Sequence, residues 1–326
     1  MEIKNKIAIG CLVQWYEIEL IEEYLISLKN AVREIKNREN IIIDFCFNIN
    51  EDLEKLDTSK ANMNEISRRF DKMVSDTLSD CSYTISRNEV NIYTIADYRR
   101  DFNDHFCTRA DILMWGETDS LIPRQTFQIL DNLHEGVKNT TPKYVGFFAT
   151  CKMWDKSWEV LEHPEFTVKP FIENDTKNWW SLKYNMSIDE MNSFNDKVVD
   201  LDVKTTNQLK FNGCGLIISS DVIKSGVNIP RSVFFVHEDT AFMNSCMIQF
   251  GGNLPQYIIK NILLVHNRKH PKKRLYVVGE EGIKPGDNGA ARKRHDWYVK
   301  ANKLCEQNAY NLLNQNKTYT WDDVFK

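Results

Sequence analysis

The stretch "ILMWGETDSL", residues 112–121, places two carboxylates directly after an apolar run. Four apolar residues and a glycine precede Glu117, and Asp119 follows two positions later. In an extended chain the side chains alternate, so residues i and i+2 point the same way. Two acids held this close repel each other unless a cation or a shared proton offsets their charge. The spacing therefore predicts that Glu117 and Asp119 hold a positive group at a strand end. The alternative is a solvated acidic turn.

The elements around these acids follow an alternating rhythm of strands and helices. Apolar runs predict strands at residues 6–13, 40–50, 83–95, 111–115, 143–154, 211–220, 231–239 and 261–271. Helical spacing of apolar residues predicts helices at residues 17–35, 51–79 and 98–109, and in the tail. This rhythm is typical of an α/β fold with a mostly parallel sheet flanked by helices. Ligands of such sheets bind beyond the carboxyl ends of the strands, where Glu117 and Asp119 are expected.

Bulk composition excludes several classes of protein. The chain has 326 residues, 42% of them hydrophobic, and a net charge of −4, so it is not a polycation built to coat nucleic acid. Its eight cysteines form no C-x-x-C pair and are expected to be reduced. The short, acidic N-terminal apolar run is not typical of a signal peptide, and no run approaches the ~18 residues of a membrane span. These features predict a cytoplasmic protein with no membrane association.

The order of motifs resembles the nucleotide-sugar glycosyltransferases of the GT-A fold. The resemblance covers roughly residues 5–271. "AIGCLVQWYEIELIEEYLISLKNA" resembles the opening strand, turn and helix, with Gln14 in place of the usual Pro and Glu17 in place of the usual Asn. "IIIDFCFN" resembles the second strand, although the paired aspartates of the family are missing. "WGETDSL" resembles the D-x-D motif, "HEDTAF" the later acidic motif, and "VHNRKHP" the downstream metal-binding histidine.

This resemblance implies a metal-dependent transfer from a UDP-sugar to a hydroxyl group. Asp119 is the expected direct ligand of Mn²⁺ or Mg²⁺, Glu117 is expected to bind the metal through water or to hold the ribose, and His266 would add a nitrogen ligand that favours Mn²⁺. Asp239 is the expected base for the acceptor, with Glu238 as its neighbour. Asp155 is a rival base, because tryptophans on both sides would raise its pKa.

Further residues are expected to bind the donor. One of Arg99 and Arg100 would pair with the diphosphate, while the other is expected to be a solvated helix charge. Gly213 and Gly215 in "FNGCG" would offer backbone N–H groups near the sugar, or would simply mark a bulged strand. The remaining residues that the resemblance places near the nucleotide are Gln14, Tyr16, Asp44 and Thr118.

The predicted organisation is one glycosyltransferase domain, residues 1–271, followed by an extension, residues 272–326, that is basic and then helical. The nucleotide-binding half would be residues 1–121 and the acceptor half residues 122–271. The basic, aromatic C-terminal region resembles bacteriophage enzymes that glycosylate hydroxymethylated cytosine in DNA, so nucleic acid is one hypothesis for the acceptor. A saccharide or a lipid-linked acceptor is the alternative.

Two other classes of function remain open. "HNRKH" together with the acids suggests a metal-dependent nuclease, although Pro271 and the basic residues after it fit the required metal loop poorly. A non-catalytic sugar-binding module with the same fold is the other alternative. The presence of both "ETD" and "HED" argues against a binding module, because a binder needs no base.

Overall fold

The computed structural model describes residues 1–18, 20–48, 62–88, 92–150, 187–207, 213–266, 296–313 and 318–326. The strands are β1 (Ile7–Gln14), β2 (Ile41–Asn48), β3 (Tyr83–Asn88), β4 (Ile112–Gly116), β5 (Ser120–Leu121), β6 (Val145–Thr150), β7 (Val203–Thr206), β8 (Ile217–Ser219) and β9 (Gln256–His266). The α-helices are α1 (Ile21–Arg33), α2 (Met63–Thr77), α3 (Ile95–Phe106), α4 (Thr126–Val137), α5 (Ile188–Asn195), α6 (Ser220–Lys224), α7 (Glu238–Phe250), α9 (Asp296–Tyr310) and α10 (Trp321–Phe325). Short 3-10 turns are η1 (Trp15–Glu17), η2 (Arg38–Asn40) and η4 (Gly251–Asn253).

The described strands form one sheet in the order β3-β2-β1-β4-β8-β6-β9-β5, with β7 also paired to β9. Strands β3, β2, β1 and β4 run parallel. Strand β8 joins antiparallel between β4 and β6, and β9 runs parallel to β6. The predicted α/β class with a helix-flanked, mostly parallel sheet is therefore confirmed. The carboxyl ends of the four parallel strands share one edge of this sheet.

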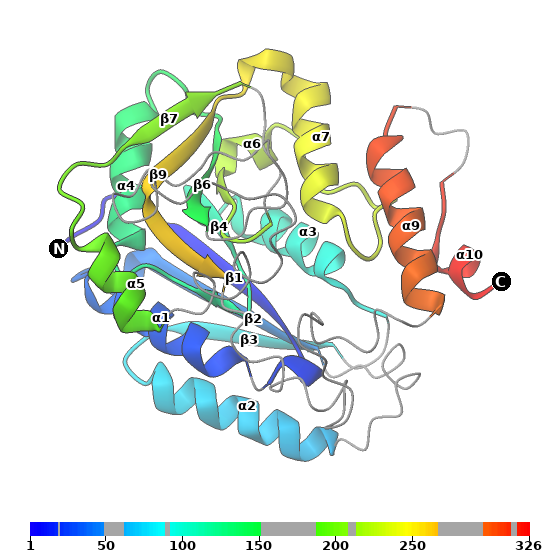
Figure 1. Cartoon of the computed structure of the whole chain (residues 1–326), viewed down its shortest axis with the longest axis horizontal. Coiled ribbons are helices and arrows are strands. Elements are labelled where there is room, and N and C mark those ends of the chain that lie inside the picture. Colours follow the sequence, from blue (N-terminus) through cyan, green and yellow to red (C-terminus); the bar gives the residue numbers. More distant parts are fainter. Residues whose placement is uncertain are drawn as a thin grey trace, which may run out of the picture.

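Helices cover both faces of the sheet (Figure 1). One apolar cluster joins the sheet to α1, α2 and α4, and a second joins it to α3, α6 and α7. Strands β1 and β4 are buried along nearly their whole length, which explains their continuous apolar sequences. The amphipathic spacing of α1 and α3 follows from the single face that each helix turns to the sheet. None of the helices in the described ranges has both the length and the apolar character needed to cross a bilayer.

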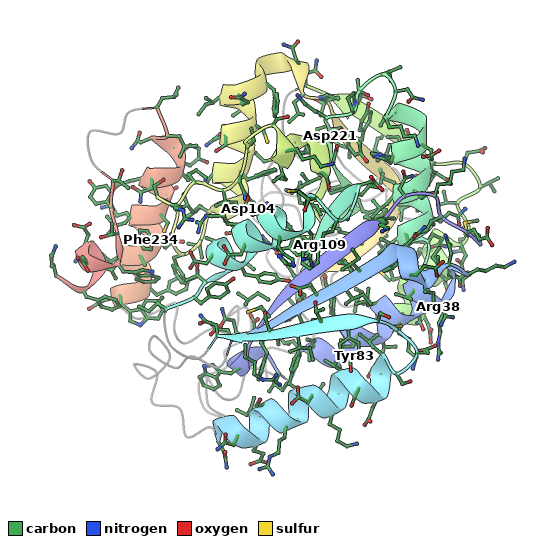
Figure 2. The ribbon with its side chains drawn as sticks, turned by 180° about the vertical axis from the view of Figure 1, so that it is seen from behind. Arg38, Tyr83, Asp104, Arg109, Asp221 and Phe234 are labelled. Carbon is green, nitrogen blue, oxygen red and sulfur yellow. The ribbon has the colours of Figure 1, made fainter. Side chains whose placement is uncertain are left out.

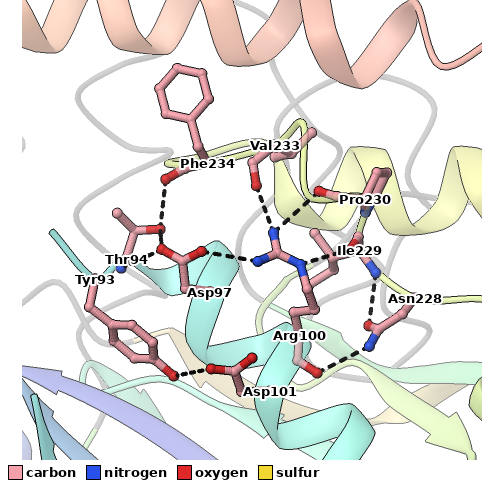
Figure 3. Close-up of polar contacts among 10 residues, drawn as sticks. All are labelled: Tyr93, Thr94, Asp97, Arg100, Asp101, Asn228, Ile229, Pro230, Val233 and Phe234. Carbon is pink, nitrogen blue, oxygen red and sulfur yellow. Dashed lines mark hydrogen bonds and ion pairs between the residues drawn. The ribbon is translucent and has the colours of Figure 1, made fainter. Parts of the chain in front are cut away.

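The strand predicted at residues 231–239 is wrong. Residues 231–237 form a loop, which we call the approach loop because it leads into α7. Arg100 binds backbone carbonyls at the start of this stretch (Figure 3): its guanidinium donates to Val233 inside the stretch at 2.9 Å, and to Ile229 and Pro230 just before it at 2.9 and 3.2 Å. Carbonyls bound to a side chain are not available to a β ladder. Glu238 and Asp239 consequently occupy the first turn of a helix.

The C-terminal helices pack against the approach loop rather than standing apart. Phe234 and Phe235 share a small apolar cluster with α9 and α10, and Figure 2 shows Phe234 beside these helices. The helical character predicted for the tail is confirmed by α9 and α10. The basic part of the predicted extension lies outside the described residues. The boundaries proposed for the two halves and the extension stay predictions.

Candidate functional site

The first acidic motif lies on a turn at the carboxyl edge of the sheet. Strand β4 ends at Gly116, and the chain turns so that the N–H and hydroxyl of Ser120 donate to the Glu117 carbonyl at 3.1 and 2.9 Å. Thr118 is buried, whereas Glu117 and Asp119 on either side of it are partly exposed. The alternation expected from the sequence therefore persists through the turn, although the strand does not.

Two other segments meet this turn. The Thr118 hydroxyl donates to the carboxylate of Glu17 at 3.2 Å, which ties the turn to η1. Strand β5 pairs with β9 so that Ser120 lies opposite His266. Because Asp119 directly precedes Ser120 in the chain, the backbone of His266 lies near Asp119. The role of His266 as a metal ligand stays a prediction. The side chains of His266 and Tyr16 lie outside the described residues, as does Asp155.

Glu17 is a third acid at the carboxyl edge of the parallel strands, and no role for it was predicted from the sequence. Burial raises the pKa of the Cys11 thiol, and Glu17 and Glu117 raise it further. Because Cys11 lies opposite Gly116 in the β1–β4 pairing, both carboxylates approach the carboxyl ends of these two strands. Glu17 follows the end of β1 by three residues, and this position in the sequence could have predicted that it lies at the carboxyl edge.

Arg99 joins the two acidic motifs. Its guanidinium donates to Glu117 at 2.8 Å and forms a second ion pair with Glu238. It also donates to the Gly213 carbonyl at 3.0 Å and lies over the ring of Trp115, with 4.7 Å from Cζ to the ring centroid. Arg99 is only 2% exposed, so it is a buried connector between β4, α7 and the segment before β8.

The electrostatics of this cluster favour protonation of Glu238. Burial raises the pKa of Glu238 to about 7, the ion pair with Arg99 opposes this shift, and Asp239 and Glu117 add to it. One guanidinium faces two carboxylates here, with Asp239 close by, so Arg99 does not neutralise the whole cluster. Conversely, Glu238 and Glu117 raise the pKa of Arg99 against the effect of burial, so the guanidinium remains charged.

Asp239 differs from Glu238 in its surroundings. Its Oδ1 accepts the N–H of Thr240 at 2.7 Å, and the residue is partly exposed. Its Oδ2 lies 3.5 Å from the position that a Cβ would take at Gly213. Both acids follow His237, whose backbone has a left-handed φ of 66° and starts α7. The arrangement leaves Asp239 as the more accessible carboxylate of the pair.

The glycines act differently from the expectation. The Gly213 carbonyl contacts the cluster, and a Cβ there would lie 2.7 Å from an Arg99 nitrogen. The N–H of Gly215 donates to the Trp115 carbonyl at 3.1 Å, and its φ of +71° makes the turn into β8. A Gly215 N–H bound to the main chain does not serve a sugar. Gly213 is required for the close approach of Arg99.

Arg100 is not a solvated helix charge, contrary to the expectation for one of the two arginines. It is 8% exposed, and its guanidinium donates hydrogen bonds to carbonyls in and next to the approach loop and to the Asp97 carboxylate at 3.0 Å. Asn228 links the segment before the approach loop to α3, since its side chain donates to the Arg100 carbonyl at 3.0 Å (Figure 3). The described contacts of both arginines are with groups of the protein, and the predicted pairing of one of them with a diphosphate stays a prediction. Arg99 binds the acids and Arg100 shapes the loop that presents them.

Two other predicted donor-binding residues lie in different places on the sheet. Gln14 ends β1, and its side-chain oxygen accepts from the buried Asn48 at 2.9 Å. Asn48 also donates to the Tyr93 carbonyl at 2.8 Å. Asp44, in contrast, lies inside β2 opposite Gly10 and accepts from the Tyr98 hydroxyl at 2.9 Å. Asp44 thus fixes α3 to the sheet, whereas Gln14 and Asn48 lie at the edge where a nucleotide is expected.

The metal site predicted at Asp119, Glu117 and His266 is completed only in part by described side chains. Within the described residues, no group of three or more His, Cys, Asp or Glu side chains is arranged to hold a metal. Glu117 pairs with Arg99, and Asp119 is partly exposed on the same turn. Partly exposed carboxylate oxygen is the donor that Mg²⁺ and Mn²⁺ prefer. The chemistry of Asp119 is compatible with such an ion, and the ligand set of Asp119, Glu117 and His266 stays a prediction.

Comparisons with known proteins give a partial likeness of fold. No protein-family model matches the sequence, and no curated protein matches it. Among solved structures, the chain is similar to S. aureus TarS 1-349, with 9% identity and a TM-score of 0.45 over 96% of this chain and 73% of that one. TarS 1-349 in complex with UDP-GlcNAc matches with 8% identity and a TM-score of 0.42, over 95% of this chain and 76% of that one. UDP-glucose pyrophosphorylase complexed with UDP-glucose matches with 9% identity and a TM-score of 0.37, over 79% of this chain and 91% of that one. Because these TM-scores are below 0.5, they carry no argument about function.

Proposed function

We propose that this chain is a glycosyltransferase of the GT-A kind, which moves a sugar from a UDP-sugar to a hydroxyl acceptor with the help of a divalent cation. The observation that carries the proposal is the convergence of two distant acidic motifs on Arg99. Glu117 follows β4, Glu238 starts α7, and both contact one buried guanidinium at the carboxyl edge of the parallel strands. A donor site and a base would have to meet at such an edge.

The donor would lie across the carboxyl ends of β1 and β4. Gln14 and Asn48 mark the nucleotide end of this edge, and Asp119 marks the diphosphate end. A Mn²⁺ or Mg²⁺ ion held by Asp119 would neutralise the leaving diphosphate. Glu117, held by Arg99, is better placed to orient the turn or the ribose than to bind the metal directly.

The base of an inverting transfer would be Asp239. It would accept the proton of the acceptor hydroxyl as the oxygen attacks the anomeric carbon and the diphosphate leaves. Glu238 is less suited, because its carboxylate is buried in the ion pair with Arg99. Asp239 is the partly exposed residue of the first turn of α7, so it could accept a proton without breaking that pair. Asp155, the rival base, lies outside the described residues.

The acceptor we propose to test first is hydroxymethylated cytosine in duplex DNA, as the basic segment between residues 266 and 295 suggests. This segment lies outside the described residues apart from the backbone of His266. Transfer to DNA should weaken as salt rises, because binding releases counterions. Activity on duplex DNA that is indifferent to salt would exclude this acceptor and leave a saccharide or a lipid-linked acceptor.

The central experiment is calorimetric binding of UDP with and without Mn²⁺, on the parent chain, on Asp119→Ala and on Asp76→Ala. Asp76 is an exposed acid on α2 that pairs with Lys72, far along the chain from the site, and serves as the matched control. We expect metal-dependent binding in the parent and the control, and none in Asp119→Ala. Turnover would then be tested with UDP-GlcNAc and UDP-glucose as the first donors.

A second variant separates the base from the donor site. Asp239→Asn should keep metal-dependent UDP binding while transfer falls by roughly 10²- to 10⁴-fold. Equal transfer by the parent and this variant would remove Asp239 from the mechanism. If no nucleotide binds the parent under any condition, the glycosyltransferase proposal fails, and nicking of plasmid DNA with Mn²⁺ would test the nuclease alternative.

A further inference from the structure

The approach loop, residues 231–237, is held from two sides before it delivers Glu238 and Asp239 into α7. On the sheet side, Arg100 donates to the Val233 carbonyl at 2.9 Å, and the Thr94 hydroxyl donates to the Phe234 carbonyl at 2.9 Å. On the outer side lie the C-terminal helices α9 and α10 (Figures 1 and 2). We propose that these two helices are a positioning element for the acid pair, and that Asn308 is its central residue. The catalytic consequence of this inference rests on the proposed function.

The first contact between the helices and the loop is aromatic. Phe234 meets Trp321 of α10 edge to face, with 4.9 Å between the ring centroids. Phe235 packs between α9 and α10, at 5.8 Å from Trp297 and 5.5 Å from Trp321. Both phenylalanines are less than 9% exposed, so removal of the helices would expose two adjacent apolar rings. This burial ties the loop to both helices at once.

The second contact is a buried amide that joins three segments. Asn308 on α9 is 5% exposed, and its Nδ2 donates to the Ser232 carbonyl at 2.6 Å. The same amide donates to the Tyr319 carbonyl at 2.9 Å and accepts the Tyr319 N–H at 3.1 Å. Asn308 therefore fixes the start of the approach loop to α9 and to the segment that begins α10. Loss of its side chain would leave buried backbone groups without these partners.

The third contact places the sulfur of Cys305 against the loop backbone. Burial raises the pKa of this thiol, and the N–H groups of Phe234, Val236 and Phe235 act in the opposite direction. Three successive amides thus face one side chain of α9, one turn before Asn308. Farther along α7, the Asn244 side chain donates to the Ala309 carbonyl at 3.0 Å. Helix α9 consequently contacts both the approach loop and the body of α7.

These contacts act on the acids through geometry. The backbone at His237 has a left-handed conformation, and Glu238 must reach Arg99 directly after it. A loop released on its outer side would still be held by Arg100, but its last residues would be free to relax. The first turn of α7 would then shift relative to Arg99 and to Asp119. We expect the proposed donor site at the carboxyl ends of β1 and β4 to be unaffected, because the side chain of Asn308 bonds only to the approach loop and to Tyr319 among its described contacts.

The test compares Asn308→Ala with Asn302→Ala, the same substitution at a partly exposed position of the same helix. Hydrogen–deuterium exchange would follow residues 232–240, with β1 and β4 as the reference. We expect exchange in residues 232–240 to rise by about tenfold in Asn308→Ala alone, because the three hydrogen bonds of the Asn308 side chain are lost. Phe235→Leu, a milder change to the aromatic contact, should raise exchange in the same residues.

Transfer kinetics then test the positioning role. We expect Asn308→Ala to lower kcat by about tenfold while the Kd for UDP with Mn²⁺ stays within about twofold of the parent value. Unchanged exchange in residues 232–240, or an equal rise across the whole chain in both variants, would overturn the inference even if the protein proved not to be a transferase. A local rise in exchange with unchanged kcat would overturn the positioning role alone. Failure of the parent to bind UDP would instead count against the proposed function.

Discussion

Arg99 and Glu238 form a buried ion pair although 139 positions separate them in the chain. The same guanidinium binds Glu117, so the two acidic motifs that stand out in the sequence share one cation. This cation is a side chain of the protein itself. The two acids of the "GETDSL" turn were predicted to hold a positive group, and for Glu117 that group is the guanidinium of Arg99. Asp119 is the acid that we propose as a metal ligand.

Arg99→Met should destabilise the fold strongly. The substitution removes the cation that pairs with Glu117 and with the buried Glu238. Loss of one partner of a buried ion pair lowers the free energy of unfolding by about 3–5 kcal/mol. We expect this loss in the free energy of unfolding, measured by urea denaturation. Arg109→Met, an exposed arginine near the end of the same helix (Figure 2), is the control and should change stability by less than about 0.5 kcal/mol.

The triple variant Arg99→Met, Glu117→Gln, Glu238→Gln tests the cause of that loss. It removes the unpaired charges, so it should recover part of the stability lost in Arg99→Met. Equal instability of the single and triple variants would show that packing of Arg99 on Trp115, rather than charge pairing, dominates.

Gly213→Ala should disturb the cluster through a single methyl group. The added Cβ would lie 2.7 Å from an Arg99 nitrogen, so the guanidinium must move. We expect a loss of about 1–3 kcal/mol in the free energy of unfolding, as for other overpacked sites. The measurement is thermal or urea unfolding, with transfer activity as a second readout.

Gly136→Ala is the matched control for that substitution. Gly136 lies in α4 with no atom within 4 Å of its Cβ position, so alanine should stabilise the helix by about 0.5–1 kcal/mol. A Gly213→Ala protein as stable as the parent would mean that Arg99 moves without cost and is not a rigid connector.

The stability of the parent should depend on pH through Glu238. Burial raises the pKa of this carboxyl to about 7, whereas a glutamate of the unfolded chain titrates near 4.3. The folded state therefore favours the protonated form of Glu238. The contribution of this preference to the free energy of unfolding is complete below about pH 4.3 and is lost as pH rises through about 7. Relative to Glu238→Gln, the parent should lose stability between about pH 4.3 and about pH 7.

Urea unfolding at a series of pH values measures this difference. The test uses the change of this stability difference with pH rather than its absolute size, because Glu238→Gln also weakens the contact with Arg99 at every pH. A difference that grows in favour of the parent as pH rises would mean that Arg99 holds Glu238 ionised throughout and that its pKa is lowered.

His237 should prefer glycine to alanine. Its φ of 66° is left-handed, where a Cβ costs roughly 1–2 kcal/mol and glycine does not. We expect His237→Gly to be at least as stable as His237→Ala in thermal unfolding, although glycine usually destabilises. A clearly more stable alanine variant would show that the backbone leaves the left-handed region readily, and that the start of α7 is not held in place.

Much of the sheet was predictable because its signals are local. The continuous apolar runs of β1, β2 and β4 and the helical spacing of α1 and α3 each lie within one segment, and the structure confirms them. The acids at the end of β4 were found for the same reason, since a strand that ends in a turn places polar residues at the sheet edge. The approach loop was mistaken for a strand because its apolar residues serve α9 and α10, which follow it by some 60 residues or more.

The sequence by itself determined the α/β class, the strands of the parallel half and the presence of two acidic motifs, because alternation, periodicity and turn residues act over a few positions. Only the tertiary structure decided which charges meet. Arg99 and Arg100 are adjacent in sequence, yet their partners differ: Arg99 joins the carboxylates of the two acidic motifs, whereas Arg100 binds mainly backbone carbonyls. Their partners come from segments more than 100 positions away in most cases, and no local pattern encodes such a choice, since it depends on how whole elements pack.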